Sequence, residues 1–255
     1  MINFMENYKF IGKSIFFPEK GILVIGDLHL GYEQAMIEAG ILTPKSQIKE
    51  LIKELGELIG KTSPKKIIFL GDIKHLFSFN KEESFSFNEV LEFLRDKFED
   101  KNIIFIKGNH DTIDYSFQDK FKDYYIEDGK AFIHGDKSFV EIFDKKIKTI
   151  VMGHIHPSIT LTDKETTKKE RYKCFLTGKF SKKDVIILPS FLGVQSGSPV
   201  NEFDEAYEDS FSIIPKKDIM NFEIHAIGKD KTYEFGKIKE REHDKNNPKK
   251  ACCLI

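Results

Sequence analysis

The chain has 255 residues, of which 40% are hydrophobic and 32% are charged, and its formal net charge is −1. This length allows one α/β domain, or one domain with a small appendage. A net charge near zero does not indicate a nucleic-acid-binding protein, and no apolar run approaches the roughly 18 residues that a membrane span needs. The cysteines, Cys174, Cys252 and Cys253, offer no disulfide framework and no C-x-x-C pair, so any metal must bind to oxygen atoms and imidazoles.

Apolar runs of strand length recur along the chain, with helical patterns between them. In chain order, we predict a strand at 22–25, a helix at 44–59, a strand at 67–70, a helix at 87–98, and strands at 103–106, 131–133, 149–152, 158–162, 171–177 and 185–188. The strands are rich in Ile and Val, as strands buried on both faces are. The helices carry apolar residues at three- and four-residue intervals. This alternation predicts a layered α/β fold.

The last third of the chain predicts further strands between 222 and 235, with 228–231 as a hairpin loop. We expect two sheets packed face to face with helices outside. The domain should run from residue 1 to 236, followed by a charged, flexible tail at 237–255. The first ten residues are polar and do not resemble a secretory signal, so we expect a cytoplasmic protein without a membrane partner.

Five short polar stretches follow the ends of predicted strands. They are GDLH at 26–29, GD at 71–72, GNHD at 108–111, HGD at 134–136 and GHIH at 153–156. Loops at the carboxyl ends of strands in open α/β sheets meet at one crevice, so these stretches are expected to converge. Six of the eight histidines lie in or beside them, namely His29, His75, His110, His134, His154 and His156.

The spacing within these stretches is typical of metal binding. Asp27 and His29 are two residues apart, as are His154 and His156, so each pair can bind a metal from one short extended segment. Asp72 offers two carboxylate oxygens, which suit a bridge between cations about 3.5 to 4 Å apart. Such a pair of cations can stabilise both the attacking and the leaving oxygen of a displacement at phosphorus.

The candidate ligands combine imidazole, carboxylate and amide groups: Asp27, His29, Asp72, Asn109, His134, His154 and His156. With no thiolate among them, the set suits Mn, Fe or Zn better than Ca or Cu(I). Two divalent ions would face only two carboxylates, so the site should attract an anion and acidify a bound water. The residues therefore predict two-metal hydrolysis of phosphoester bonds.

The ordered set D-x-H, GD, GNHD, HGD and GHxH, over roughly residues 21–157, resembles the signature of the calcineurin-like metallophosphoesterase superfamily. The resemblance implies a four-layer α/β sandwich, with two mixed sheets packed face to face between flanking helices. GDLHLGYE at 26–33, GDIKHLF at 71–77 and LPSFLGVQSGSPVN at 188–201 are similar to the archaeal SbcD-related branch and the bacterial ligase-associated phosphoesterases, relatives of recombination-repair nucleases. About 60 residues follow Pro189, which leaves little room for the DNA-capping domain and coiled-coil partner site of those nucleases.

The resemblance also implies a role for each metal ligand. The first ion would be held by Asp27, His29, His156 and the shared Asp72, and the second by Asn109, His134, His154 and the same Asp72. Two ions are therefore expected as cofactors, with manganese favoured and iron or zinc as alternatives.

Three further residues are implied in catalysis. His110 matches the histidine that contacts the phosphate and protonates the leaving oxygen, for which a pKa near neutrality is suited. Asp111 would orient His110 or close the GNHD turn. His75 matches a histidine near the substrate of the nuclease relatives, with a packing or supporting role as an even alternative.

Three functions remain open on the sequence. The favoured one is a metal-dependent phosphodiesterase or nuclease for single-stranded or duplex nucleic acid, with a metal-bridging hydroxide as nucleophile and His110 assisting departure. The alternative is a phosphatase or phosphodiesterase for a small nucleotide or other phosphoester. A non-catalytic scaffold is disfavoured because no ligand is missing. Net charge favours the small substrate, whereas a local basic excess at 164–173 favours the nuclease, although it also fits a solvated hairpin tip. The segment 189–201 would form a crevice wall or a turn into the last strands.

Overall fold

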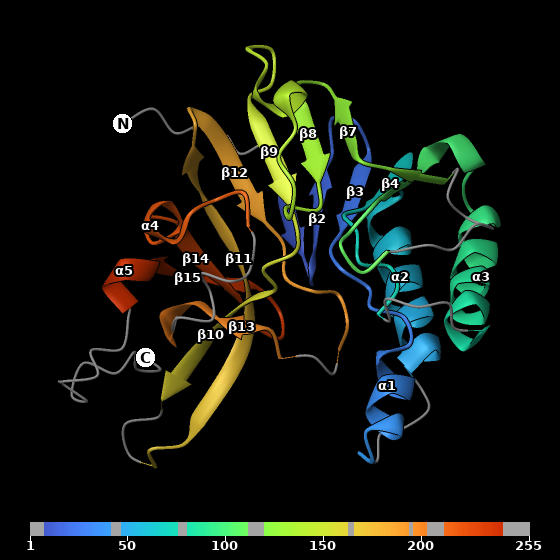
Figure 1. The fold of residues 1–255 in the computed structure, drawn as a ribbon, viewed down its shortest axis with the longest axis horizontal. Helices are drawn as coiled ribbons and strands as arrows, with labels where there is room; N and C mark the ends of the chain where they lie inside the picture. Colours follow the sequence, from blue (N-terminus) through green and yellow to red (C-terminus); the bar gives the residue numbers. More distant parts are fainter. Residues whose placement is uncertain are drawn as a thin grey trace.

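Two mixed β-sheets pack face to face between layers of helices (Figure 1). The computed structural model describes residues 8–41, 47–75, 81–111, 120–162, 166–193, 196–202 and 212–241. The first sheet has the order β1 (Lys9–Ile11), β2 (Ser14–Phe17), β3 (Ile22–Ile25), β4 (Lys66–Phe69), β5 (Ile103–Ile106) and β6 (Phe121–Lys122). Its strands from β3 to β6 are parallel, whereas β1, β2 and β3 pair antiparallel.

The second sheet has three parallel strands at its centre, and most of the pairs around them are antiparallel. Its order is β13 (Ser198–Pro199), β10 (Pro157–Thr162), β11 (Lys169–Phe180), β12 (Lys183–Ile187), β9 (Thr149–Met152), β8 (Lys130–Ile133) and β7 (Tyr124–Glu127). The hairpin of β14 (Glu223–Ile227) and β15 (Thr232–Lys237) joins through β11. Strands β12, β9 and β8 are parallel, so the carboxyl ends of β8 and β9 lie at one edge.

Helices cover the outer faces of both sheets (Figure 1). The first sheet carries α1 (Tyr32–Glu38), α2 (Gln47–Thr62) and α3 (Lys81–Arg95) on its side. Beside the second sheet lie short helices: α4 (Lys216–Ile219), α5 (Ile238–Arg241) and the 3-10 turns η3 (Val140–Phe143) and η4 (Val200–Glu202). A further 3-10 turn, η1 (Asp100–Asn102), leads into β5. The observed layers confirm the predicted α/β sandwich.

The layering explains why the central strands are apolar throughout. In β3, Leu23 and Ile25 face the core under α2 and α3, whereas Ile22 and Val24 face the core between the sheets. Strand β9 shows the same alternation, since Val151 lies between the sheets and its neighbours face the core on the other side. Side chains on successive strand residues point to opposite faces, so a sheet covered on both sides needs apolar residues at every position.

The predicted strands are found with ends shifted by a few residues, and the chain turns between β14 and β15 at 228–231, where the Gly228 N–H donates to the Lys231 carbonyl at 2.9 Å. The second helix was predicted wrongly at both ends, since α3 spans 81–95 and not 87–98. Its first turns carry polar residues without apolar periodicity, which hid them. Helix α2 is described from Gln47, and the predicted residues 44–46 lie outside the described chain. Strands β1, β2, β6 and β7 and helix α1 were not predicted.

The predicted start of the tail at 237 is wrong. Strand β15 ends at Lys237, and α5 follows directly. Ile238 is fully buried, and its N–H donates to the Phe222 carbonyl at 3.0 Å. A single apolar residue in a charged run gives no periodicity, so the sequence pattern could not show this anchor. The fold extends at least to Arg241, while 242–255 lie outside the described residues and the single-domain organisation stays a prediction.

Candidate metal centre

Loops at the carboxyl ends of five strands meet where the two sheets come together. In chain order, β3 is followed by Asp27 and His29, β4 by Asp72, β5 by Asn109, His110 and Asp111, β8 by His134, and β9 by His154 and His156. The sheets are joined across this edge, because the backbone N–H of His154 donates to both Asp27 carboxylate oxygens at 3.3 and 3.2 Å. The predicted convergence of the five stretches is therefore observed.

Four of the predicted ligands form one tight cluster. Asp27, His29, Asp72 and His156 each place a ligand atom within 4.8 Å of the others. The His29 Nε2 lies 3.1 Å from the His156 Nε2 and 3.8 Å from Asp72 Oδ2, while the His156 Nε2 lies 3.4 Å from Asp27 Oδ1. These are the residues that the sequence assigned to the first metal.

The remaining predicted ligands gather around the His134 Nε2, which also faces the other oxygen of the shared carboxylate. The His134 Nε2 lies 2.9 Å from Asn109 Oδ1, 3.0 Å from the His154 Nδ1 and 3.5 Å from Asp72 Oδ1. Asp72 thus turns Oδ2 toward the first cluster and Oδ1 toward the second. This is the disposition that a bridging carboxylate needs.

The hydrogen bonds of His134 show that this second cluster suits a cation. Its Nδ1 lies 3.0 Å from the Leu70 carbonyl, which can only accept, so Nδ1 carries the proton. Burial lowers the pKa of His134 to about 4, so the ring is neutral at pH 7 and Nε2 presents a lone pair. That lone pair faces the Asn109 carbonyl oxygen at 2.9 Å. Two facing acceptors repel unless a cation lies between or beside them.

The buried carboxylates also indicate that the site needs cations. Asp27 is completely buried and Asp72 is 2% exposed. Burial, together with the charge of Asp27, raises the pKa of Asp72, so the pair does not readily carry two negative charges alone. For Asp27 burial also acts to raise the pKa, but His156, His134 and His29 outweigh it and the net shift is downward. Burial lowers the pKa of His29 to about 2, so that imidazole adds no positive charge beside the two carboxylates. Divalent cations would supply the positive charge that these two buried carboxylates lack.

The backbone at the centre is held in a conformation that L-residues rarely adopt. Positive φ angles occur at His29 (45°), Asp72 (44°), His154 (70°) and His156 (48°). Each left-handed non-glycine residue costs about 1 to 3 kcal/mol and persists only where the surroundings enforce it. Four such residues lie in one cluster. The strain lowers the stability of the fold, and the backbone conformation it maintains orients these ligand side chains.

Two glycines in the motifs are explained by close approach. A Cβ on Gly153 would lie 2.5 Å from Asp27 Oδ2, and one on Gly108 would overlap the backbone nitrogen of Asp72. The chain can therefore pass the two carboxylates only where it has no side chain.

His110 lies beside the bridging carboxylate. Its backbone N–H donates to Asp72 Oδ1 at 2.9 Å, and its Nε2 lies 3.9 Å from Asp72 Oδ2. Its Nδ1 donates to the His75 carbonyl at 2.6 Å, which fixes the ring and leaves Nε2 directed at the centre. Burial is the largest influence on the ring and lowers the pKa of His110, although the bond to the His75 carbonyl acts to raise it.

Asp111 and His75 support the same corner of the site. Both oxygens of Asp111 accept backbone hydrogen bonds, from Gly108 at 2.9 Å and Lys74 at 3.0 Å, which matches the predicted alternative of closing the GNHD turn. The His75 ring stacks on His110 with centroids 5.7 Å apart, and its Nδ1 lies 3.5 Å from the His29 Nδ1. His75 therefore belongs to the rim of the centre.

The segment after β12 forms a wall of the site. The Ser190 hydroxyl and the Phe191 N–H both donate to the Asp27 carbonyl, at 3.2 and 2.8 Å. Lys173 ties the same segment down by donating to the carbonyls of Ser190 and Leu192. Of the predicted wall at 189–201, residues 194–195 lie outside the described chain.

Lys173 does not add to an exposed basic surface at 164–173, because its side chain is directed inward. Lys168 pairs with Glu170 at 2.7 Å and Lys169 with Glu202 at 3.2 Å. Lys164 lies outside the described residues. The local positive excess is therefore smaller than the sequence suggested.

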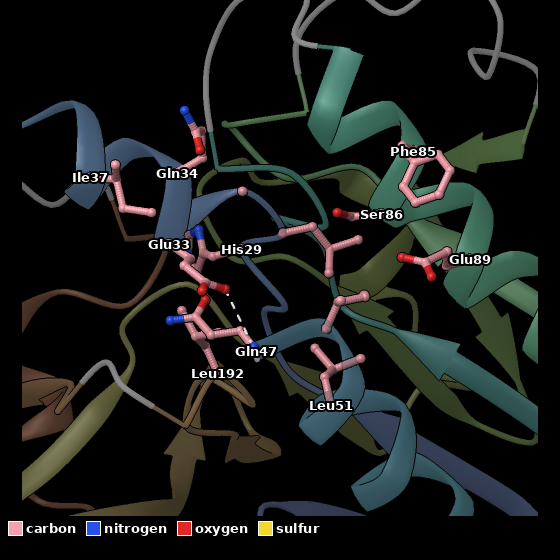
Figure 2. Close-up of a pocket in the computed structure, with 13 residues that line it drawn as sticks. His29, Glu33, Gln34, Ile37, Gln47, Leu51, Phe85, Ser86, Glu89 and Leu192 are labelled. Carbon is pink, nitrogen blue, oxygen red and sulfur yellow. Dashed lines mark hydrogen bonds between the residues drawn. The ribbon is translucent and has the colours of Figure 1, made fainter. Parts of the chain in front are cut away.

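A pocket of about 420 Å³ adjoins His29 and was not predicted from the sequence (Figure 2). It lies between α1, α2 and α3, and its walls include Glu33, Gln47 and Phe85. Helix α1 is short and buries none of its residues, so it has no apolar periodicity from which the pocket could have been found.

Comparisons with known proteins agree with this architecture. The family model for calcineurin-like phosphoesterases matches residues 21–215. Nuclease MPE from Pseudomonas putida has a similar structure, with a TM-score of 0.57 at 17% identity over 90% of this chain and 100% of that chain. The phosphoesterase Yfce from E. coli (13% identity, 84% and 96% coverage) and Vps29 from Entamoeba histolytica (14%, 84% and 90%) align with TM-scores of 0.36.

None of the curated proteins matches the chain significantly. The family match nevertheless spans more than half of the sequence and includes all five polar stretches. Divalent metal ions and a phosphoester substrate follow from the family and from the cluster of His and Asp ligands. The chain belongs to the calcineurin-like phosphoesterase family, and it is a metal-dependent hydrolase.

Proposed function

We propose that the protein is a two-metal phosphodiesterase that acts on nucleic acid or its fragments. The observation that carries this proposal is the pair of ligand clusters that share Asp72, one oxygen facing each. A phosphodiester carries one negative charge and needs charge neutralisation on both the attacking and the leaving side. A single-ion site would not explain why a second set of imidazole and amide ligands gathers beside the first.

The proposed ligand sets are those of the sequence: Asp27, His29, His156 and Asp72 for one ion, and Asn109, His134, His154 and Asp72 for the other. When bound, two divalent ions would neutralise the substrate phosphate and acidify a water molecule for attack. The mixture of imidazole, carboxylate and amide ligands favours manganese, with iron or zinc as alternatives.

His110 is proposed as the residue that holds the proton for the leaving group. Its Nδ1–H is fixed on the His75 carbonyl, so Nε2 can contact a phosphate oxygen or donate to the departing alkoxide. His75, stacked on the same ring, would keep His110 in that orientation. Asp111 would act through the turn that carries both Asn109 and His110.

The choice of nucleic acid over another phosphoester rests on the likeness of the longer motifs to repair-nuclease relatives. A nuclease with the same fold is a further support, although its identity of 17% transfers no substrate. The alternative, hydrolysis of a small nucleotide or other phosphoester, is favoured by the net charge of −1 and by the paired basic side chains of the 164–173 stretch. Membership of the SbcD-related branch, a DNA-repair role and a cytoplasmic location remain predictions.

The Asp72→Asn variant tests the shared carboxylate. The amide keeps the volume but loses the second anionic oxygen, so we expect at least a roughly hundredfold loss of manganese-dependent cleavage of bis(p-nitrophenyl) phosphate and loss of both bound ions by metal analysis. Asp184→Asn, an exposed aspartate paired with Lys179, is the matched control and should keep full activity. Retention of two ions and normal turnover in Asp72→Asn would exclude a bridging role.

The same enzyme should then be offered cyclic nucleotides, single-stranded oligonucleotides and duplex ends with manganese. Faster cleavage of oligonucleotides supports the nuclease. Faster cleavage of mononucleotides or cyclic nucleotides supports the alternative.

A further inference from the structure

The pocket adjoins the metal centre through His29, and its other walls come from segments outside the five motifs. Figure 2 shows Glu33 and Gln34 of α1 on one side, Phe85, Ser86 and Glu89 of α3 on the other, and residues of α2 between them. His29 lies at the boundary of this pocket and of the first ligand cluster. A substrate whose phosphorus lies at the metal centre would therefore extend its substituent toward these helices.

The charge of the lining excludes a second phosphate as the occupant. Among the described residues that line the pocket, the ionisable side chains other than His29 are Glu33 and Glu89, and none is lysine or arginine. Carboxylates repel a phosphate backbone, which needs cationic partners. The rest of the wall is largely apolar, with Leu30, Ile37, Ile48, Leu51, Phe85 and Leu192. The lining thus suits an uncharged group with a flat apolar surface.

Two side chains add detail to that description. Phe85 is a large aromatic residue left 66% exposed on α3, where its ring offers a free face. The Gln47 Nε2 atom is shielded from solvent and has no hydrogen-bond partner within the described part of the chain, although the Gln47 backbone N–H donates to Glu33 Oε2 at 3.3 Å. A buried amide donor without a partner is costly in a folded protein, so this atom points to an acceptor supplied by a ligand.

We propose that this pocket binds a nucleobase of the substrate, which deepens the proposed function and rests on it. The Phe85 ring would stack on the base, and the Gln47 amide would donate to a ring nitrogen or carbonyl of its edge. A carboxylate such as that of Glu89 can accept from an exocyclic amine. A base paired within a duplex cannot enter, so the substrate class is a single strand or a nucleotide ester.

A series of esters with one leaving group tests the proposal. The p-nitrophenyl esters of thymidine 5′-phosphate, thymidine 3′-phosphate, phenyl phosphate and methyl phosphate all release nitrophenolate, so kcat/KM compares only the retained group. We expect at least one thymidine ester to exceed the methyl and phenyl esters by about fivefold or more, within the range for one stacked base. Phe85→Ala and Gln47→Leu should each reduce that preference several-fold. Tyr233→Ala, which removes another exposed aromatic ring on β15, should not change it.

The outcomes separate this inference from the proposed function. Hydrolysis of every ester without a preference for thymidine, or a preference that survives both substitutions, overturns the nucleobase site and leaves the phosphodiesterase intact. Equal rates for the phenyl and thymidine esters would show a merely apolar pocket and also overturn it. If no ester is hydrolysed, the proposed function fails, and calorimetry decides the pocket by itself: thymidine 5′-monophosphate must bind the manganese-loaded protein more tightly than methyl phosphate, and more tightly than it binds Phe85→Ala.

Discussion

At the scale of single residues, His110 is held in place by a backbone carbonyl and by a stacked ring. Its Nδ1–H donates to the His75 carbonyl, its ring stacks on His75, and its Nε2 lies 3.9 Å from Asp72 Oδ2 at the centre. In the His110→Asn variant, the amide can still donate to that carbonyl but cannot supply a proton to an alkoxide. We expect kcat for a dinucleotide, which has a poor leaving group, to fall about 10²- to 10⁴-fold.

The same variant should lose much less activity with bis(p-nitrophenyl) phosphate, because nitrophenolate leaves without a proton. Manganese binding measured by calorimetry should be unchanged within about twofold, since no ligand is removed. His225→Asn is the matched control, because His225 is buried in β14 against the Thr177 hydroxyl at 2.8 Å, within the second sheet. An equal loss on both substrates would remove His110 from the protonation of the leaving group.

At the scale of elements, α2 carries a glycine that packing does not require. A Cβ on Gly60 would meet no atom within 4 Å, and Gly60 lies inside the helix. Alanine restricts the unfolded chain more than glycine does, so Gly60→Ala should raise the free energy of unfolding by about 0.5 to 1 kcal/mol. For a protein of this size, that gain corresponds to a Tm increase of about 1 to 4 °C.

Gly12→Ala provides the opposite case. It has similar space, with the nearest atom 3.9 Å away on Leu58, but its φ is +56° and a Cβ strains that conformation. We expect this variant to be less stable than the wild type by about 1 kcal/mol. Urea unfolding of both variants checks the pair, and a stabilised Gly12→Ala would contradict the assigned backbone conformation.

At the scale of the whole molecule, the metal centre links loops that belong to different sheets. Asp27 belongs to a loop of the first sheet and accepts from the His154 backbone in a loop of the second. Bound ions stabilise the folded state by an amount set by their concentration over Kd, about 2.7 kcal/mol at a hundredfold excess. Removal of manganese with EDTA should therefore lower Tm by about 5 to 10 °C.

The shift on metal removal has an internal control. Gly60→Ala should show the same shift from a higher starting Tm, because Gly60 lies in α2 and is not one of the predicted ligands. Asp72→Asn should show little shift, because it no longer retains the ions. Identical melting with and without manganese in the wild type would contradict metal binding at this edge.

Among the described helices, none is both long enough and apolar enough to cross a bilayer.

Much of the fold and the convergence of the seven candidate ligands could be predicted from the sequence. A strand buried on both faces must be apolar at every position, and ligands placed after parallel strands must lie at one edge of the sheet. Both features can therefore be recognised from short stretches of sequence. Their assignment to particular metals remains a prediction. The short edge strands, α1 and the anchor at Ile238 were missed, because elements of a few residues have too little periodicity to be seen.

Tertiary structure alone decided what lies beside the centre. The pocket combines α1, α2, α3 and Leu192, which are separated by long stretches of sequence and show no common motif. Lys173 looked like part of a basic surface, yet it binds the wall at Ser190. Local sequence determines which side chains are available and on which face of a strand they stand, whereas long-range packing decides which of them share a space, because contacts between distant segments leave no periodic trace in either one.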